Sequence, residues 1–396
     1  MQRIHIVGGG LAGLTAAITA AESHAPVTLH EAHRTLGGRA RTSDGPYLTN
    51  EGPHALYRRG PHWTWLSKRG LLGPLASVPP LEGARFLFHR GGTLRRTPPL
   101  GMLRLARRSA RTAPVGTDFL SWATAETGEA GARAAAHYMG VALFHHDPGS
   151  LSAAFVQERF RRATALPPEA HYPVGGWAAL VERMAARAWD LGVRIETGAR
   201  IGPRELAGLR RGGPVIVATH LDSARALLED PALSWESGRT VLLDLALRTR
   251  RGDPFIVSDL DAPGWIERFT AQDPTLAPAG EQLIQAQIPL APGTPRADAV
   301  RRAEELLDLG FRSWRDRATW RREALASGRT GAVDKPGTTW RDRPAVDRGD
   351  GILLAGDQVA APGLLSEVAF NSGIEAAVLA VKLLATTART DTRTAT

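Results

Sequence analysis

The segment from Arg3 to Glu31 constrains the fold more than any other part of the chain. It begins with a short β-rich run that ends abruptly in glycines, continues with apolar residues at helical spacing, and closes with a second β-rich run. This order predicts a strand, a tight turn, a helix and a second strand. The turn contains the pattern G-x-G-x-x-G, formed by Gly8, Gly10 and Gly13.

Each of these glycines has a physical role. Gly8 permits the tight turn, Gly10 lets a pyrophosphate approach the backbone, and Gly13 lets the helix pack closely on the strand. The first N–H groups of the helix, at Leu11 and Ala12, can then hold phosphate charge together with the positive end of the helix dipole. The segment therefore predicts a dinucleotide site.

An acid follows at the expected distance. Glu31 ends the second predicted strand, directly before Ala32, and its carboxylate can accept hydrogen bonds from ribose hydroxyls while it would repel a 2′-phosphate. A glycine pattern alone is weak evidence, but a strand before it, a helix after it and an acid at this spacing make the prediction strong.

A second glycine loop, Gly37-Gly38-Arg39, follows the acid. Arg39 offers a forked donor with a permanent charge. A nicotinamide dehydrogenase has no standard need for this loop, whereas an enzyme that binds a flavin dinucleotide does. Together with the segment from Gly8 to Glu31, it resembles the superfamily of flavin amine oxidases, phytoene desaturases and protoporphyrinogen oxidases. The phytoene desaturase-like branch is the most similar.

This resemblance implies further cofactor contacts. The segment Gly52-Pro53-His54 is similar to one that passes beside the isoalloxazine ring, and His54 is a weak candidate for a catalytic group that touches flavin or substrate. A purely structural histidine is an equally good interpretation. The resemblance also implies contacts from Ile201 on the adenine side and from Thr219 beside the cofactor.

The C-terminal part supplies a third motif. A buried strand is predicted to end at Gly356-Asp357, and a helix is predicted to begin at Glu367. In the superfamily the aspartate binds ribitol or pyrophosphate, and the start of the helix, here Glu367 and Val368, faces the flavin pyrimidine. Because the chain has no cysteine and no histidine in a recognised attachment motif, we expect FAD to be bound non-covalently.

These motifs predict an α/β fold with a doubly wound, discontinuous FAD-binding domain of the Rossmann type. A second, α+β substrate domain should contain an antiparallel sheet, because Val241–Leu247, Phe255–Val257, Trp265–Thr270 and Gln282–Leu290 read as strands. The predicted FAD-binding domain comprises residues 1–75, 171–235 and 336–396, and the predicted substrate domain comprises residues 76–170 and 236–335.

The predicted function is FAD-dependent dehydrogenation of a largely apolar small molecule by hydride transfer to flavin N5, with oxygen or a quinone as electron acceptor. Many amine oxidases of the superfamily place a lysine near N5, but Lys68, Lys335 and Lys382 fit that position poorly. Apolar residues of the predicted strands should line the substrate cavity. The candidates for this wall are Leu243, Leu245, Trp265, Phe269 and Ile288.

Other functions stay open at this point. They are amine oxidation, a redox-neutral isomerisation that uses reduced FAD, a non-catalytic flavoprotein and, with less support, a plain NAD-dependent dehydrogenase. The net charge of +9 comes from a composition in which all but three of the 49 basic residues are arginine. No nucleic-acid-binding module accompanies it, so we expect no nucleic-acid partner. We also expect no metal site.

The expected location is the cytoplasm. Only Met1 and Gln2 precede the first predicted strand, and no uninterrupted apolar run reaches the ~18–20 residues of a membrane span. The segment 100–111 is basic and amphipathic, and it could lie on a membrane surface or cover a substrate tunnel. A solvated helix face is the more common interpretation of such a pattern.

Overall fold

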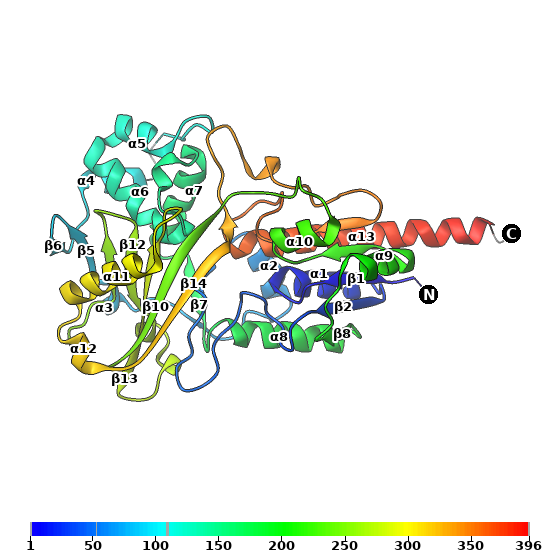
Figure 1. The fold of residues 1–396 in the computed structure, drawn as a ribbon, viewed down its shortest axis with the longest axis horizontal. Coiled ribbons are helices and arrows are strands. Elements are labelled where there is room, and N and C mark those ends of the chain that lie inside the picture. The colour runs from blue at the N-terminus through cyan, green and yellow to red at the C-terminus, as the bar shows by residue number, and fades with distance from the viewer. Residues whose placement is uncertain (1, 53, 108–110, 395–396) are drawn as a thin grey trace.

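The structure, a computed structural model, describes residues 2–52, 54–107 and 111–394. It has two lobes that lie side by side (Figure 1), one built on a five-stranded sheet and the other on a seven-stranded sheet. Both ends of the chain lie at the outer end of the first lobe, which we call the dinucleotide lobe.

The sheet of the dinucleotide lobe is entirely parallel. Its strands, in spatial order, are β15 (Ile352–Leu354), β9 (Val215–Val217), β1 (Ile4–Val7), β2 (Val27–Glu31) and β8 (Arg194–Thr197). From β1 the chain continues to β2 on one side, whereas β9 and β15 lie on the other side. The predicted doubly wound class is confirmed. The domain boundaries stay a prediction, although the strands come from the beginning, the middle and the end of the chain.

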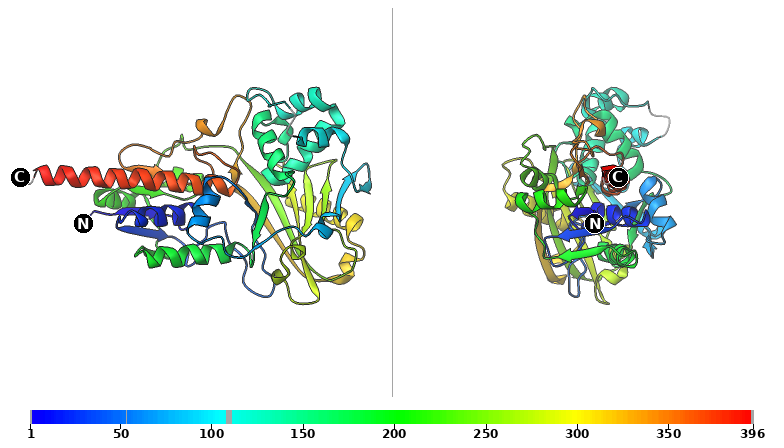
Figure 2. Two further views of the ribbon diagram at one scale, coloured as in Figure 1. Left: turned by 180° about the vertical axis from the view of Figure 1, so that it is seen from behind. Right: turned by 90° about the vertical axis from the view of Figure 1, so that its right-hand side faces the viewer.

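Six helices of the described chain surround this sheet. They are α1 (Leu11–Glu22), α2 (Pro61–Lys68), α8 (Trp177–Asp190), α9 (Pro203–Gly212), α10 (Leu221–Leu228) and α13 (Ser366–Thr394). Helix α1 lies between α8 and α13 and contacts both (Figure 2). The C-terminal helix therefore packs directly on the helix that follows the glycine turn.

Two glycines allow α1 to approach its neighbours without intervening side chains. A Cβ atom on Gly13 would lie 1.9 Å from the carbonyl oxygen of Gly8, so only glycine permits this helix–strand distance. A Cβ atom on Gly373 of α13 would lie 2.5 Å from the carbonyl oxygen of Ala12. The backbone of α1 is thus held tightly from both sides.

The second lobe contains the predicted antiparallel sheet. Its strands, in spatial order, are β14 (Ala318–Ala332), β10 (Ser237–Arg248), β13 (Glu281–Pro289), β12 (Gly264–Arg268), β11 (Ile256–Asp259), β5 (Phe86–Arg90) and β6 (Thr93–Arg95). All neighbours pair antiparallel except β11 and β5. All four predicted strands are present, whereas the long strand β14 was not foreseen.

The remaining elements complete the second lobe and its junction. Helices α4 to α7 gather at one end of the seven-stranded sheet, as the cyan ribbons in Figure 1 show. A small three-stranded sheet lies near the junction of the lobes. These elements are β3 (Leu56–Tyr57), β4 (Leu75–Ala76), β7 (Ala170–Pro173), α3 (Pro80–Gly83), α4 (Leu100–Ala106), α5 (Phe119–Thr127), α6 (Glu129–Leu143), α7 (Ala153–Ala163), α11 (Arg296–Gly310) and α12 (Trp314–Arg317).

The prediction of the cavity wall was wrong for three of its five residues. Leu243, Leu245 and Ile288 are buried in the core that the sheet forms with α11. Side chains directly opposite each other on paired strands share one face of a sheet, and the next residues along each strand point to the other face. The face turned away from α11 therefore carries their neighbours, among them Asp244 and Gln287.

The amphipathic segment 100–111 is helical only in part. Helix α4 ends at Ala106, and residues 108–110 lie outside the described residues. Met102 and Leu105 are buried, whereas Leu100 and Leu103 are 59% and 44% exposed. One side of this helix packs in the protein, and the other presents apolar side chains to the surface.

Among the described residues, the Ser366–Thr386 part of α13 is long and apolar enough to cross a membrane by length and composition, with a mean hydropathy of 1.6. Half of this window is buried inside the protein. The same stretch packs along α1, which accounts for its apolar composition as that of a core helix.

The close contact of α1 with β1 can be tested by a pair of glycine substitutions. Gly13→Ala should abolish folding or lower the melting temperature strongly, because the added methyl group has no space. Gly208→Ala in α9 is the matched control: its Cβ atom would meet only the Arg211 side chain at 3.8 Å. This control should raise stability by about 0.5–1 kcal/mol, since alanine favours a helix interior. Equal melting temperatures for both variants in thermal unfolding would contradict the steric explanation.

Candidate functional site

The candidate site begins at the carboxyl ends of β1 and β9, where the order of the parallel strands reverses. Ligands of open α/β sheets bind in the crevice at such a point. Gly8, at the end of β1, has a φ of 111°, and a Cβ atom there would lie 2.5 Å from the carbonyl oxygen of Ala218. The loops after the two strands therefore leave the sheet in close contact, and no side chain fits between them.

Gly10 faces the second glycine loop. It forms an isolated bridge with Gly37, but a Cβ atom on Gly10 would meet only Gly37 and Gly38 at ordinary distances of 3.7 and 3.9 Å. The protein alone does not explain a glycine here, whereas a ligand that approaches the backbone does. Gly10 also precedes Leu11 and Ala12, whose N–H groups belong to the unpaired first turn of α1.

Glu31 closes the other side of the crevice. Its carboxylate is 5% exposed and accepts the N–H groups of Gly9 at 2.7 Å and His33 at 2.8 Å, one on each oxygen. Each oxygen keeps further acceptor capacity, so the predicted contact with ribose hydroxyls is compatible with this geometry. The carbonyl of Glu31 accepts the N–H group of Ala199. The loop that carries Ile201 thus begins beside the end of β2, where Ala32 also lies.

Arg39 and Asp357 form an ion pair across the crevice, with 2.6 Å between Nη2 and Oδ1. Both were predicted to contact the cofactor, but their mutual contact was not foreseen. The pair joins the second glycine loop to the loop after β15. Gly356, Asp357 and Thr219 also line a small cavity of about 10 Å³, which is enough for one water molecule.

The contact of Glu367 and Val368 with the flavin stays a prediction, while the structure shows which protein groups they bind. The Glu367 carboxylate turns toward the second lobe and accepts a hydrogen bond from Arg162 of α7 at 2.8 Å. The backbone N–H groups of Glu367 and Val368 donate to the carbonyls of Leu364 and Leu365. These groups are therefore occupied within the protein, and the Glu367 side chain connects the two lobes.

The segment before His54 lies against an aromatic ring of the protein. Gly52 has a φ of 101°, and a Cβ atom there would lie 2.8 Å from the Phe144 ring. Pro53, the next predicted cofactor residue, lies outside the described residues. Asn50, two residues before Gly52, is anchored through its side-chain oxygen, which accepts hydrogen bonds from the Thr42 hydroxyl and from the N–H group of Trp177.

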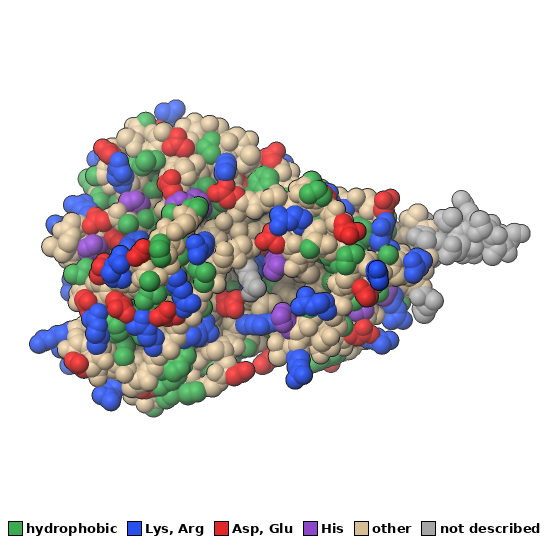
Figure 3. All heavy atoms as spheres, viewed as in Figure 1, with side chains coloured by type: hydrophobic (Ala, Val, Ile, Leu, Met, Phe, Trp, Pro, Cys, Tyr) green, Lys and Arg blue, Asp and Glu red, His purple; other side chains and the backbone are tan. Residues whose placement is uncertain are grey.

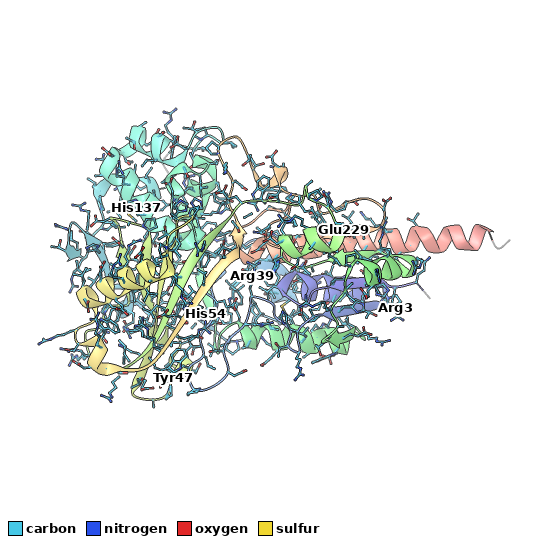
Figure 4. All side chains as sticks on the ribbon, in the orientation of Figure 1. Arg3, Arg39, Tyr47, His54, His137 and Glu229 are labelled. Atoms are coloured by element: carbon cyan, nitrogen blue, oxygen red, sulfur yellow. The ribbon has the colours of Figure 1, made fainter. Side chains whose placement is uncertain are left out.

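His54 is labelled close to the boundary between the lobes in Figure 4, and the surface in the same orientation is hollowed between the lobes (Figure 3). It is 1% exposed and packs against the rings of Tyr172 and Phe269, with centroids 5.3 and 5.1 Å away. Neither ring nitrogen has a hydrogen-bond partner among the described residues. Burial lowers the pKa of His54 to about 4, and nearby Asp273 only partly offsets this effect.

A neutral, buried imidazole with two unpaired nitrogens is a good contact for a ligand and a weak base at neutral pH. The unpaired nitrogens favour the cofactor or substrate role over a histidine satisfied by local backbone. The low pKa disfavours the role of proton acceptor, because proton transfer is most effective when the pKa lies near the working pH.

A buried acid near His54 was missed by the sequence reasoning. Glu267 of β12 is 1% exposed, and burial raises its pKa to about 7, although Gln272 and Tyr172 donate hydrogen bonds to it. Tyr172 touches His54 on one side and Glu267 on the other. The only signal in the sequence was a charged residue at an inward position of a strand, and its orientation depends on the register.

The lysines lie at the surface, as expected for a site without a lysine over N5. Lys335 is 63% exposed and pairs with Glu236 at 2.5 Å. Lys68 and Lys382 are exposed on α2 and α13. No lysine is therefore buried at the junction of the lobes.

One group of side chains has the composition of a metal site. The ligand atoms of His89, Asp259 and Asp261 lie within 4.8 Å of one another at the edge of the second sheet. Arg302 already donates to Asp259 at 2.8 Å, and His89 bonds the same carboxylate at 2.9 Å. These contacts explain the group as a hydrogen-bonded network around the Asp259 carboxylate.

Solved structures share this architecture over nearly the whole chain. Cyclohexylamine oxidase from Brevibacterium oxydans superposes with a TM-score of 0.69 at 16% identity, over 96% of this chain and 99% of that chain. Reduced UDP-galactopyranose mutase superposes with a TM-score of 0.66 at 14% identity, over 96% of each chain. At these identities the likeness establishes the fold.

Residues 6–71 match the family of NAD(P)-binding Rossmann-like domains. The chain therefore has a Rossmann-like dinucleotide-binding domain within an amine oxidase-like fold, and the resemblance predicted from the sequence is confirmed. A particular homologue is the carotenoid phi-ring synthase of Streptomyces griseus, which is 30% identical over 339 residues, or 68% of this chain. The chain spans 61% of the length of that relative.

The burial of His54 predicts a pH dependence of stability. The pKa is 6.5 in the unfolded chain and about 4 in the folded protein. The contribution of His54 to the free energy of unfolding is thus complete above pH 6.5. It falls as the pH drops toward 4, because only the unfolded chain takes up the proton readily. Between pH 7.5 and 4.5 this contribution should amount to about 2–3 kcal/mol.

His54→Phe should remove that contribution in urea unfolding at the two pH values, since a phenyl ring suits the aromatic surroundings. Other buried histidines titrate in both proteins, so the difference between variant and wild type isolates His54. His24→Asn, at an exposed position, is the control and should behave as the wild type. An identical pH dependence in His54→Phe would show that His54 is not buried as a neutral group.

Proposed function

We propose that the chain binds FAD non-covalently in the crevice between β1 and β9. The single observation that carries this proposal is the space beside Gly10 at the start of α1, where an added Cβ atom would meet only Gly37 and Gly38 at ordinary distances. Glu31 would hold the ribose hydroxyls and Arg39 the pyrophosphate, while Asp357 would hold the ribitol. The Arg39–Asp357 pair keeps both side chains oriented toward one crevice.

Bound FAD would supply the acceptor for a hydride at its N5 atom. The residues of this chain would position the substrate and exclude water. His54, Tyr172 and Phe269 provide a buried aromatic surface at the junction of the lobes. His54 would contact the ligand as a neutral group, and Glu267 is a buried carboxyl group whose pKa is raised by burial to about 7.

We propose that the substrate is a largely apolar small molecule of the carotenoid type, and that the reaction is a dehydrogenation. The homology to a carotenoid phi-ring synthase supports this class. Amine oxidation is less well supported, although named amine oxidases share the fold, because all three lysines are exposed. We further propose oxygen or a quinone as electron acceptor.

A cytoplasmic location with peripheral membrane contact through the segment 100–111 agrees with an apolar substrate. Leu100 and Leu103 are exposed on α4, and Arg104 lies beside them. Such a surface can rest on a lipid headgroup region while the buried side of α4 stays in the protein.

The cofactor proposal predicts a yellow protein that releases intact FAD on denaturation. Glu31→Ala and Arg39→Ala should each weaken FAD binding by about 1–3 kcal/mol, because charged hydrogen bonds are lost. Arg348→Ala is the matched control: Arg348 is 30% exposed and pairs with Asp230, while Arg39 is 34% exposed and pairs with Asp357. The measurement is a titration of the apoprotein with FAD. A colourless protein that binds NAD more tightly than FAD would contradict the proposal.

The reaction proposal predicts that a carotenoid in detergent bleaches the oxidised flavin spectrum under anaerobic conditions, whereas cyclohexylamine and putrescine do not. Lys335→Met should leave the rate of bleaching unchanged, because Lys335 is bound to Glu236 at the surface. Bleaching by an amine that is lost in Lys335→Met would restore the amine oxidase interpretation.

A further inference from the structure

One row of side chains across the second sheet carries unpaired polar atoms. Ser258 of β11 lies directly opposite Trp265 of β12, and Trp265 lies directly opposite Gln287 of β13. Residues so paired share one face of the sheet, and this face is the one turned away from α11. We call Ser258, Trp265 and Gln287 the polar row.

Each member of the polar row has a buried polar atom without a hydrogen-bond partner among the described residues: Ser258 Oγ, Trp265 Nε1 and Gln287 Oε1. Ser258 and Gln287 are 0% exposed. The next row along the same face contrasts with this, since Glu267, Gln285 and Asp244 are all hydrogen-bonded. An unpaired buried group destabilises the folded protein, so three of them in line indicate a missing partner.

The orientation of the Gln287 amide follows from its neighbours. The nitrogen of Gln285 donates to two groups that can only accept, the carbonyl of Asn50 at 3.1 Å and the Asp244 carboxylate at 2.6 Å. Gln285 must therefore turn its oxygen toward Gln287, whose nitrogen donates to it at 3.0 Å. The Gln287 oxygen is left as a fixed, unpaired acceptor.

These contacts also connect the polar row with the proposed flavin site. Gln287 bonds Gln285, and Gln285 bonds the carbonyl of Asn50, four residues before His54. The polar row is therefore next to the hydrogen-bonded row of Glu267, Gln285 and Asp244, and Gln285 of that row reaches the Asn50 carbonyl. Glu267, which lies on the same strand and face as Trp265, accepts a hydrogen bond from Tyr172, whose ring packs against His54.

We propose that the polar row binds a hydroxyl group of an otherwise apolar substrate; this inference rests on the proposed function and narrows its substrate class. The indole N–H of Trp265 can only donate, and Gln287 Oε1 can only accept. A hydroxyl oxygen accepts from the first, and its proton is donated to the second. A keto group or a carboxylate lacks the proton that Gln287 requires, and a hydrocarbon satisfies neither residue.

The test compares two probes that differ by one ring hydroxyl, β-carotene and β-cryptoxanthin. Each is titrated into the purified full chain at one fixed detergent concentration, and binding is followed by the change in carotenoid absorption. The wild-type protein should bind the hydroxylated probe at least about tenfold more tightly, because a site built to hydrogen-bond a hydroxyl rejects the analogue without it.

Two variants assign the preference to the polar row. Gln287→Leu and Trp265→Phe should each reduce it to less than about twofold, with little change in the binding of β-carotene. The matched control is Gln282→Leu. Gln282 lies on the same strand and also has an unpaired oxygen, but it lies opposite Leu247 on the α11 face. This control should keep the preference. Circular dichroism establishes that each variant is folded.

Equal binding of the two probes by the wild type, or no binding of either, overturns the inference; the row then holds water only. A preference that survives in both Gln287→Leu and Trp265→Phe overturns it as well. Flavin bleaching is recorded in the same samples. A preference without bleaching contradicts the proposed dehydrogenation and leaves the hydroxyl site standing.

Discussion

The bare contact between α1 and β1 is the constraint on which the dinucleotide lobe depends. Because Gly13 has no side chain, the helix lies against the carbonyl of Gly8, and its unpaired N–H groups open directly into the crevice. Gly373 repeats the arrangement on the opposite side of the helix, where α13 meets Ala12. A larger residue at any of these points would displace the first turn of α1, and the crevice would no longer form around Gly10.

The sequence predicted this lobe well because its requirements are local and steric. The roles of Gly8, Gly10 and Gly13 can be predicted without knowledge of distant residues. The same holds for the role of Glu31, the acid that ends β2. The ion pair of Arg39 with Asp357 could not be predicted, since its partners come from opposite ends of the chain and meet only when β15 joins the sheet.

The second lobe was predicted less completely, because the alternation of apolar residues along a strand does not say which face of the sheet is covered. An alternating strand indicates that two faces exist, but only pairing decides which face meets a helix. Leu243 was expected at the cavity and packs on α11, while its neighbour Asp244 points the other way. Glu267 was missed for a related reason: a carboxylate is expected at the surface, and only the register buries it.

The contact of α7 with the start of α13 has a mechanical consequence. Arg162 holds the Glu367 carboxylate, and Arg159 donates to the carbonyl of Gly363 just before the same helix. Swinging the lobes apart on this side would leave Glu367, which is 4% exposed, without its counter-ion in a poorly solvated place. The contacts of Arg162 and Arg159 with the start of α13 therefore hold the two lobes together on this side, and a separation of the lobes here would cost the desolvated ion pair of Glu367.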